Sequence, residues 1–199
     1  MTHESGRGGL GPPSDAGDAG GLEAIARAAG SGARNSDAAP VHLWNPPYCG
    51  DIGLAIAADG SWTYRGSAIT RKPLVALFAS VLRKDEDGRT YLVTPAEKVD
   101  VAVADAPFIG VALRFEGTGE HADVGVRTNL DTWVTIDAAH PIRFTVQEPA
   151  GGLKPYVLIR GRLEALLSRA AYLELVDHAI DSGGEPGFWS GGQRWPLGG

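Results

Sequence analysis

Several features are scarce in this sequence, and each shortage excludes a class of protein. The chain has a single cysteine, Cys49, so no internal disulfide bond can form, which fits a reducing compartment. No stretch approaches the roughly 18 consecutive apolar residues of a membrane-spanning helix. The N-terminus lacks the apolar core of a signal peptide. These shortages predict a cytoplasmic protein without a membrane span.

Clusters of basic residues and of metal-binding side chains are also missing. The 24 acidic residues outnumber the 18 lysines and arginines, for a formal net charge of −6, whereas nucleic acids are bound by clustered cations. The five histidines are scattered, and no pair has the spacing of zinc ligands. We therefore expect neither a nucleic-acid partner nor a metal site.

Catalytic motifs are absent as well. The sequence contains no Gly-x-Ser-x-Gly nucleophile elbow, no Gly-x-x-x-x-Gly-Lys-[Ser/Thr] phosphate loop and no dinucleotide-binding fingerprint after a strand. We expect no cofactor and assign no catalytic residue. Cys49, with His42 and Asp51 nearby in sequence, suggests a thiol enzyme, but a nucleophilic cysteine needs a base within hydrogen-bond distance. A buried structural cysteine is the favoured interpretation.

The local patterns that are present are clearest in the first half of the chain. Residues 52–56 alternate between large apolar and small side chains, as in a half-buried strand. Asp59 and Gly60 favour a two-residue hairpin turn, and residues 62–64 alternate again as the return strand. Residues 74–82 then carry apolar side chains at helical spacing. Together these signals predict two strands joined by a hairpin turn, followed by a helix.

The remaining patterns divide the chain into three parts. Residues 1–39 are rich in glycine, alanine, serine and aspartate, which predicts a mostly flexible arm, with a short helix available at residues 22–29. Residues 40–95 form the first α+β unit. Residues 96–199 form the second, in which short strands separated by turn residues predict a curled antiparallel sheet. A helix over residues 170–180 follows that sheet.

The second unit contains one ambiguous element and an unusual tail. Residues 163–167 suit a short strand, with a helix as the alternative. Phe188, Trp189 and Trp195 lie in a glycine-rich C-terminal segment. Because exposed aromatic side chains at this density promote aggregation, we expect the tail to pack back onto the body of the protein.

A weak internal repeat links the two units. Each unit contains an Arg-Gly pair, then a hydroxyl-bearing residue followed by arginine, then a helix. The first copy includes Arg65 and Arg71, and the second includes Arg160 and Arg169. Either a duplication or the general preference for hydroxyl residues before helices explains this pattern.

A set of short sequence words adds information about the family. In chain order these words are Trp44-Asn45-Pro46, Cys49-Gly50-Asp51-Ile52, Asp59-Gly60, Leu92-Val93-Thr94-Pro95, Asp105-Ala106-Pro107-Phe108, Arg127-Thr128-Asn129, Tyr156-Val157-Leu158 and Trp189-Ser190-Gly191-Gly192. With them the chain resembles, over residues 40–197, the bacterial family catalogued as domain of unknown function 1285. It departs from that family at Gly53, where an acidic residue is expected.

The resemblance implies a two-unit α+β fold built by duplication. It implies that the C-terminal half is similar to a pleckstrin-homology barrel, which is a curled sheet closed by a C-terminal helix. It further implies a ligand site at the interface of the two units, for a nucleotide-based molecule in signal transduction. No activity or cofactor follows from the resemblance, and a fold does not by itself determine function.

We therefore predict a ligand-binding or regulatory protein whose site lies between its two units. Aromatic rings stack on bases and arginines clamp phosphates. Arg71 is notable because a cation in the first turn of a helix opposes the helix dipole, which suggests that it has a partner. Two alternatives are an enzyme that uses Cys49 or Asp51, and an interaction module without a small ligand. The candidate site residues are Trp44, Asp51, Arg65, Arg71, Arg160 and Arg169.

Overall fold

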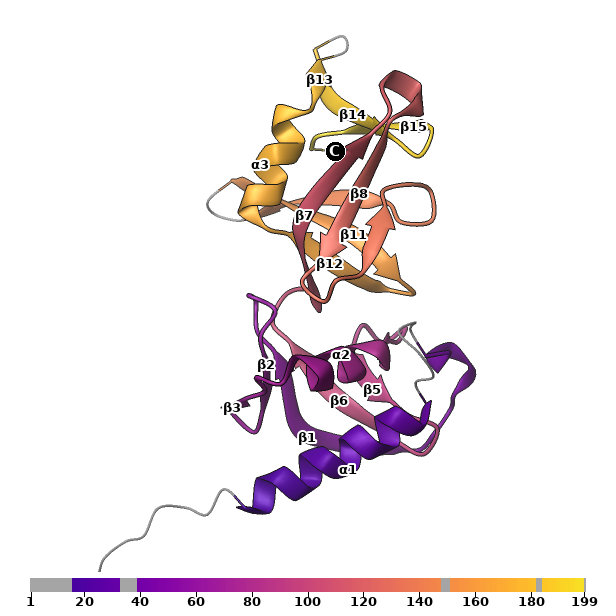
Figure 1. Ribbon diagram of the computed structural model, residues 1–199, viewed down its shortest axis with the longest axis vertical. Coiled ribbons are helices and arrows are strands. Elements are labelled where there is room, and N and C mark those ends of the chain that lie inside the picture. The colour runs from indigo at the N-terminus through magenta and orange to yellow at the C-terminus, as the bar shows by residue number, and fades with distance from the viewer. Residues whose placement is uncertain (1–15, 33–38, 148–150, 182–183, 199) are drawn as a thin grey trace, which may run out of the picture.

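The protein forms two lobes stacked along its long axis (Figure 1). The computed structural model describes residues 16–32, 39–147, 151–181 and 184–198. Each lobe is built around one six-stranded sheet, and a three-stranded sheet at the C-terminus adds to the second lobe. Within the described residues, no helix has the length and apolar character needed to cross a membrane.

The first unit is an α+β layer with the strand order β3-β2-β1-β6-β5-β4. β1 and β6 run parallel at the centre of the sheet, and every other neighbouring pair is antiparallel. Alternating apolar side chains build β1 and β2, because every second residue of a strand faces the core. The strands are β1 (Tyr48–Ile56), β2 (Trp62–Tyr64), β3 (Ser67–Ala68), β4 (Leu82–Lys84), β5 (Thr90–Val93) and β6 (Lys98–Val103).

Helices cover the first sheet, together with the short 3-10 helix η1 (Val41–Leu43). The predicted helix is α2 (Lys72–Ser80), and its Phe78 is fully buried. A second helix, α1 (Ala16–Gly32), packs against α2 and buries Ile25 and Ala29. The sequence suggested at most a short helix over residues 22–29, because the glycine-rich segment has little apolar surface of its own. The rest of the expected flexible arm lies outside the described residues.

The second unit contains a sheet of order β10-β11-β12-β7-β8-β9, which curls into a half-barrel. Helix α3 (Arg169–Asp177) packs on β7 and β12, and the short 3-10 helix η2 (Gly119–His121) joins β7 to β8. The ambiguous residues 163–167 form a strand. The strands are β7 (Phe108–Glu116), β8 (Asp123–Thr128), β9 (Trp133–Thr135), β10 (Ile142–Gln147), β11 (Gly152–Arg160) and β12 (Leu163–Leu167).

The two sheets share one strand order. When the six strands of each unit are numbered in chain order, both sheets have the order 3-2-1-6-5-4. In both, the first and last strands pair in parallel, and the other neighbours are antiparallel. The helix is placed differently, because α2 follows the third strand of its unit whereas α3 follows the sixth. The duplication is therefore visible in the sheets and not in the helices.

The division between the two sheets falls later than the expected boundary at residue 95. β6 lies between β1 and β5, so the first sheet extends to Val103. Residues 94–97 form the turn of the β5–β6 hairpin, in which the hydroxyl of Thr94 accepts a hydrogen bond from the backbone N–H of Glu97 at 3.1 Å. Pro95 therefore marks a hairpin turn rather than the end of a domain.

The Arg-Gly pairs of the sequence repeat do not occupy matching positions in the two sheets. Arg65 lies in the turn between the second and third strands of its unit, whereas Arg160 ends the fifth strand of the other unit. Turn formation explains both pairs, because Gly66 and Gly161 have φ angles of 83° and 54°, which glycine adopts without strain. The two sheets share one topology, as expected of a duplication, but the Arg-Gly pairs do not mark equivalent positions in them.

The aromatic tail packs onto the second sheet, where the backbone N–H of Val124 in β8 donates to the hydroxyl of Ser190. The tail sheet consists of β13 (Ile180–Asp181), β14 (Pro186–Ser190) and β15 (Gln193–Pro196). Phe188 is 3% exposed, and the indole N–H of Trp195 donates to the carbonyl oxygen of Ser190 at 3.1 Å.

Candidate functional site

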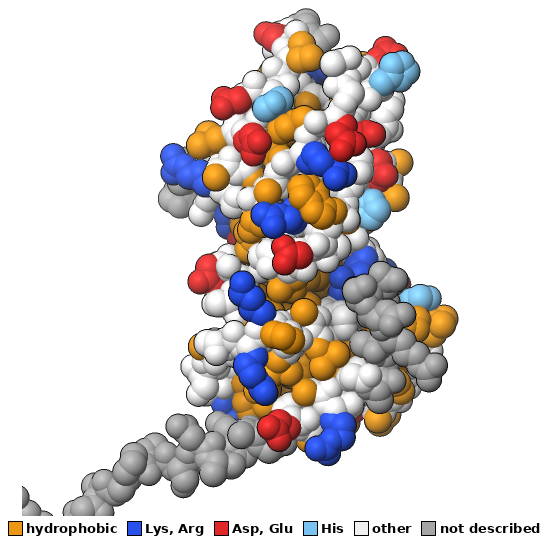
Figure 2. Space-filling model, in the orientation of Figure 1, with side chains coloured by type: hydrophobic (Ala, Val, Ile, Leu, Met, Phe, Trp, Pro, Cys, Tyr) orange, Lys and Arg blue, Asp and Glu red, His pale blue; other side chains and the backbone are white. Residues whose placement is uncertain are grey.

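Two cavities open where the two units meet. In Figure 2 this junction is the narrow waist of the molecule, and charged side chains surround it. The larger, here called the mixed cavity, has a volume of about 430 Å³. Its charged lining residues are Asp51, Lys84, Arg89, Asp100, Asp105, Arg162 and Glu164. The smaller, here called the basic groove, has a volume of about 360 Å³. Its charged or ionisable lining residues are His42, Arg83, Lys84, Arg160 and Arg162.

Most charges of the mixed cavity are already paired. The guanidinium of Arg89 lies 2.5 Å from a carboxylate oxygen of Asp100. Arg143 holds both carboxylate oxygens of Glu164 at 2.6 Å in a bidentate contact. The Asp51 carboxylate is different, because its one hydrogen bond or ion pair among the described residues is local. It accepts from the backbone N–H of Gly53 at 2.7 Å. Asp51 is therefore the carboxylate of this cavity that is most available to a ligand.

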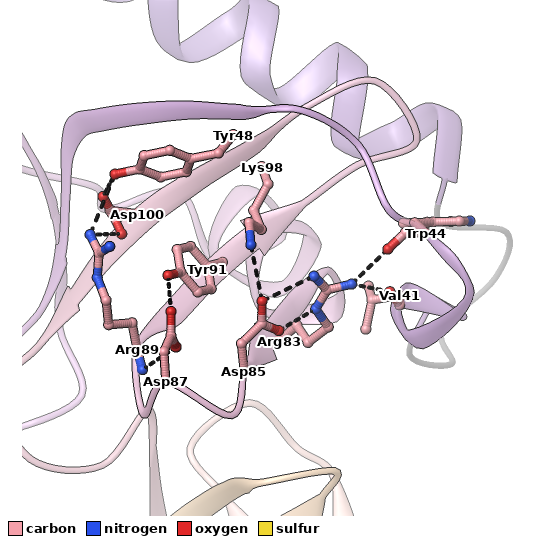
Figure 3. Close-up of polar contacts among 10 residues, drawn as sticks. All are labelled: Val41, Trp44, Tyr48, Arg83, Asp85, Asp87, Arg89, Tyr91, Lys98 and Asp100. Atoms are coloured by element: carbon pink, nitrogen blue, oxygen red, sulfur yellow. Dashed lines mark hydrogen bonds and ion pairs between the residues drawn. The ribbon is translucent and has the colours of Figure 1, made fainter.

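A network of tyrosines and charges supports one wall of the mixed cavity (Figure 3). The hydroxyl of Tyr48 donates to Asp100, and the guanidinium of Arg89 lies 5.7 Å from the ring centre of Tyr48 and 5.4 Å from that of Tyr91. Tyr91 donates to Asp87 at 2.5 Å, and this hydrogen bond, together with burial, raises the pKa of Tyr91 to about 12. These contacts fix the β4–β5 turn that carries Arg89.

A second cluster attaches the segment before β1 to β4 (Figure 3). Arg83 donates to the carbonyl oxygens of Val41 and Trp44 at 2.8 and 2.7 Å and to Asp85 at 2.6 Å. Lys98 reaches the other oxygen of Asp85 at 3.1 Å. Burial would raise the pKa of Asp85, but the hydrogen bonds and charges of Arg83 and Lys98 outweigh it and hold that pKa below its usual 3.8. This cluster builds one wall of the basic groove.

The basic groove combines cations from both units. Arg83 and Lys84 come from β4, while Arg160 and Arg162 flank the turn between β11 and β12. No Asp or Glu is among the described residues that line it. Two of these cations pair with carboxylates that do not line the groove. Arg83 pairs with Asp85, and Arg162 lies 2.9 Å from the exposed Glu86. The groove is thus a concentration of positive charge in a protein of net negative charge.

Arg160 contributes a buried donor to the groove. Its Nε is buried and has no hydrogen-bond partner within the described part of the chain. One terminal nitrogen donates to the carbonyl oxygen of Ala79, at the C-terminal end of α2, where the helix dipole favours a cation. The guanidinium also lies 5.3 Å from the ring centre of Phe108. Burial without an acidic partner lowers the pKa of Arg160.

Three of the six predicted site residues lie at or beside these cavities. Asp51 lines the mixed cavity and Arg160 lines the basic groove. Trp44 lines neither, but its carbonyl oxygen accepts a hydrogen bond from Arg83 in the groove wall. Its side chain packs, partly buried, against the core of the protein.

The other three predicted residues line neither cavity. Arg65 lies over the ring of Tyr64 at 5.1 Å, next to the β2–β3 turn. Arg71 precedes the first turn of α2 and Arg169 begins α3, and both are exposed. Their expected convergence relied on the Arg-Gly repeat, whose two copies are not equivalent in the sheets. Sequence reasoning missed Arg83, Lys84 and Arg162, which line the cavities.

The structure gives little support to a thiol enzyme. Cys49 is exposed, which corrects the expectation that it is buried, and its Sγ lies 3.6 Å from the carbonyl oxygen of Pro47. That carbonyl is not a base. Across the described segments, no group of three or more His, Cys, Asp and Glu side chains is arranged to hold a metal ion.

Comparison with solved structures identifies two similar proteins. The crystal structure of a DUF1285 family protein from Silicibacter pomeroyi DSS-3 is 41% identical, with a TM-score of 0.81 over 88% of this chain and 93% of that chain. A DUF1285 family protein from Shewanella baltica OS155 is 30% identical over 63% of this chain and 91% of that chain, with a TM-score of 0.49. No curated protein matches the chain.

Sequence profiles cover both units. The profile described as "Domain of unknown function (DUF1285), N-terminal domain" matches residues 39–106. The profile described as "Protein of unknown function (DUF1285), C-terminal domain" matches residues 107–197. Their junction coincides with the passage from β6 to β7, where the structure divides its two sheets. The chain therefore belongs to the DUF1285 family.

Proposed function

We propose that this protein is a cytoplasmic ligand-binding regulator in signal transduction, which takes an anionic, nucleotide-based small molecule at the junction of its two units. The observation that carries the proposal is the basic groove, with cations from both units, no carboxylate among its described lining residues, and a buried Nε–H of Arg160 that has no partner within the described part of the chain. Signalling and the nucleotide class are what the family resemblance implies, and the single cysteine fits the cytoplasm.

Electrostatics favour an anion in the groove. Arg83, Lys84, Arg160 and Arg162 are close enough to line one cavity, so their charges repel one another. A phosphate group would offset that repulsion, and guanidinium groups match phosphate oxygens through paired N–H donors. Arg160 loses hydration on burial and has no acidic partner among the described residues, so an incoming anion would supply one.

The neighbouring mixed cavity suits the rest of such a ligand. Lys84 and Arg162 line both cavities, so a molecule held in the groove extends naturally past them. Asp51 then offers a carboxylate to hydrogen-bond donors such as ribose hydroxyls or an exocyclic amine. No Trp, Tyr or Phe is among the described lining residues of either cavity, so the proposed base contacts are hydrogen bonds rather than stacking on Trp44.

Calorimetry on the full-length chain tests this proposal. A thermal-shift screen of inorganic phosphate and purine and pyrimidine nucleotides comes first, because a specific ligand raises the melting temperature. For the best nucleotide, we expect Lys84→Ala and Arg162→Ala each to weaken binding by roughly tenfold to a hundredfold, the value of a charge-assisted hydrogen bond. Arg114→Ala is the matched control, because Arg114 is exposed and pairs with Glu116 away from both cavities. A screen without hits, or equal affinity in all three variants, contradicts the proposal.

An interaction module without a small ligand is the second candidate. Leu173 and Val176 are 51% and 39% exposed and lie one helical turn apart on α3, and Ile180 in β13, just beyond the helix, is 59% exposed. Exposed apolar stripes of this kind often mark protein contacts. A ligand screen without hits, together with self-association that Leu173→Ser abolishes, would favour this function over the first.

A further inference from the structure

Helix α1 is held on the first unit by few side chains. Ile25 and Ala29 are 8% and 0% exposed, and Leu22 and Ala26 are partly buried against the same core. α1 packs against α2, and Glu23 points to solvent as an exposed residue. The helix precedes residue 39, where the match to the family profile begins. α1 therefore lies outside the part of the chain that the profile describes.

The sequence of α1 does not favour a helix in isolation. Five of its 17 residues are glycine, which is the least favourable residue in a helix interior after proline. Short helices are marginal in water even with good helix formers, and their stability in proteins comes mostly from packing. The helical state of α1 therefore depends on its docking, so that release and unfolding of this segment are coupled.

Gly21 of α1 lies close to Tyr64, where a side chain has little space. A Cβ atom at Gly21 would lie 2.7 Å from the hydroxyl oxygen of Tyr64, which is too close. Tyr64 is 5% exposed, with the guanidinium of Arg65 over its ring at 5.1 Å, so the ring has little room to move away. At Gly30, by contrast, an added Cβ meets nothing within 4 Å.

We propose that α1 is a reversible intramolecular ligand. The α1 face, defined as the surface formed by α2 and Tyr64, is a helix-docking site that selects a helix with glycine opposite the Tyr64 hydroxyl. Its occupant is α1 of the same chain. Weak helix propensity keeps α1 exchanging between docked and released states, and release uncovers the apolar part of the α1 face. The N-terminal segment thereby controls access to one side of the first unit.

Matched glycine variants of the full-length chain test this proposal by amide hydrogen exchange over residues 22–30. Both Gly30→Ala and Gly21→Ala raise helix propensity equally. If docking controls exchange, Gly30→Ala slows it roughly fivefold, the value of one glycine-to-alanine change. Gly21→Ala instead accelerates exchange at least about tenfold, because the contact with Tyr64 opposes docking. Equal slowing in both variants would overturn the proposal.

A second substitution and a peptide separate docking from a general loss of structure. Tyr64→Phe removes the hydroxyl that meets the new methyl group, so Gly21→Ala combined with Tyr64→Phe should recover slow exchange. A labelled peptide of residues 16–32 should bind the Gly21→Ala chain at least tenfold more tightly than the parent chain, whose face is occupied. Fast exchange in the double variant, or equal peptide binding to both chains, would show that α1 is not a ligand of this face.

Discussion

At Ser190, one buried hydroxyl connects the C-terminal tail to the second sheet. Its oxygen accepts a hydrogen bond from the backbone N–H of Val124 at 2.8 Å and donates to the carbonyl oxygen of Ile136 at 2.6 Å. Ser190 is fully buried, so water cannot replace its hydroxyl as the partner of these two backbone groups. Deleting it leaves a buried donor and a buried acceptor with one partner fewer.

We therefore expect Ser190→Ala to lower the free energy of unfolding by about 1–3 kcal/mol, the cost of leaving a buried polar group unsatisfied. Urea denaturation measures this value. Ser67→Ala is the control, because Ser67 is exposed in β3 and its loss should change stability by at most about 0.5 kcal/mol. Similar values for the two variants would show that the Ser190 hydroxyl does not hold the tail.

The carboxylate of Asp85 makes part of the stability depend on pH. Because Arg83 and Lys98 hold its pKa in the folded protein below 3.8, the unfolded chain binds the proton more tightly. The stabilisation is thus complete above about pH 5 and is lost as the pH falls through the lowered pKa. We expect the melting temperature of the parent to decline more steeply between about pH 5 and 2 than that of Asp85→Asn. Glu120→Gln, at an exposed position, should keep the parental slope.

At the scale of elements, local sequence patterns predicted a strand or helix correctly where one face of that element is buried. The strands of the first hairpin and helix α2 follow from alternation and from helical spacing of apolar residues. α1 was underestimated because it packs against α2, and no local pattern shows that tertiary contact. The residues of β6 were assigned to the second unit, and their place in the first sheet was not predicted, because parallel pairing with β1 joins segments far apart in sequence.

The candidate site was predictable only in part for the same reason. Asp51 and Arg160 were identified, since each lies in or next to a recognisable sequence word or turn. Lys84 and Arg162 were not, because nothing local distinguishes a cation at a strand end from one in solvent. Their shared position on both cavities arises from the packing of β4 against the β11–β12 turn, which no sequence period encodes.

The tail sheet contributes a large apolar anchor that can be tested separately. Phe188 in β14 is 3% exposed and belongs to the core of the second unit. Phe188→Ala should lower the free energy of unfolding by about 3–5 kcal/mol, as for other buried phenylalanines. Leu173→Ala, at a position that is 51% exposed, should cost far less. Chemical denaturation of both variants decides the matter, and a small loss for Phe188→Ala would mean that the tail contributes little.

For the molecule as a whole, the contact between the two units includes the tip of the β1–β2 hairpin. A Cβ atom at Gly60 would lie 2.7 Å from the amide nitrogen of Asn129 and 2.9 Å from Ile109, both in the second unit. Gly88 has a similar φ of 79°, against 81° for Gly60, and open space around it. The two glycines thus share one backbone requirement and differ in their surroundings.

Gly88→Ala should therefore cost about 1–2 kcal/mol of stability, the strain of a left-handed alanine. Gly60→Ala should cost about 1–3 kcal/mol more, because its methyl group also overpacks the junction. Thermal unfolding monitored by calorimetry distinguishes the two. Equal losses would indicate that the hairpin tip and the second unit separate without cost.

The parallel pairing of the first and last strands determines how the units are joined. A chain that enters a sheet through its first strand and leaves through a parallel last strand exits at the opposite end from its entry. An antiparallel closing pair would return the chain to its starting end and place the next unit alongside the first. Here β6 instead delivers the chain directly to β7, and the lobes follow one another along the long axis (Figure 1). The two units are therefore connected in series, each entered at one end of its sheet and left at the other.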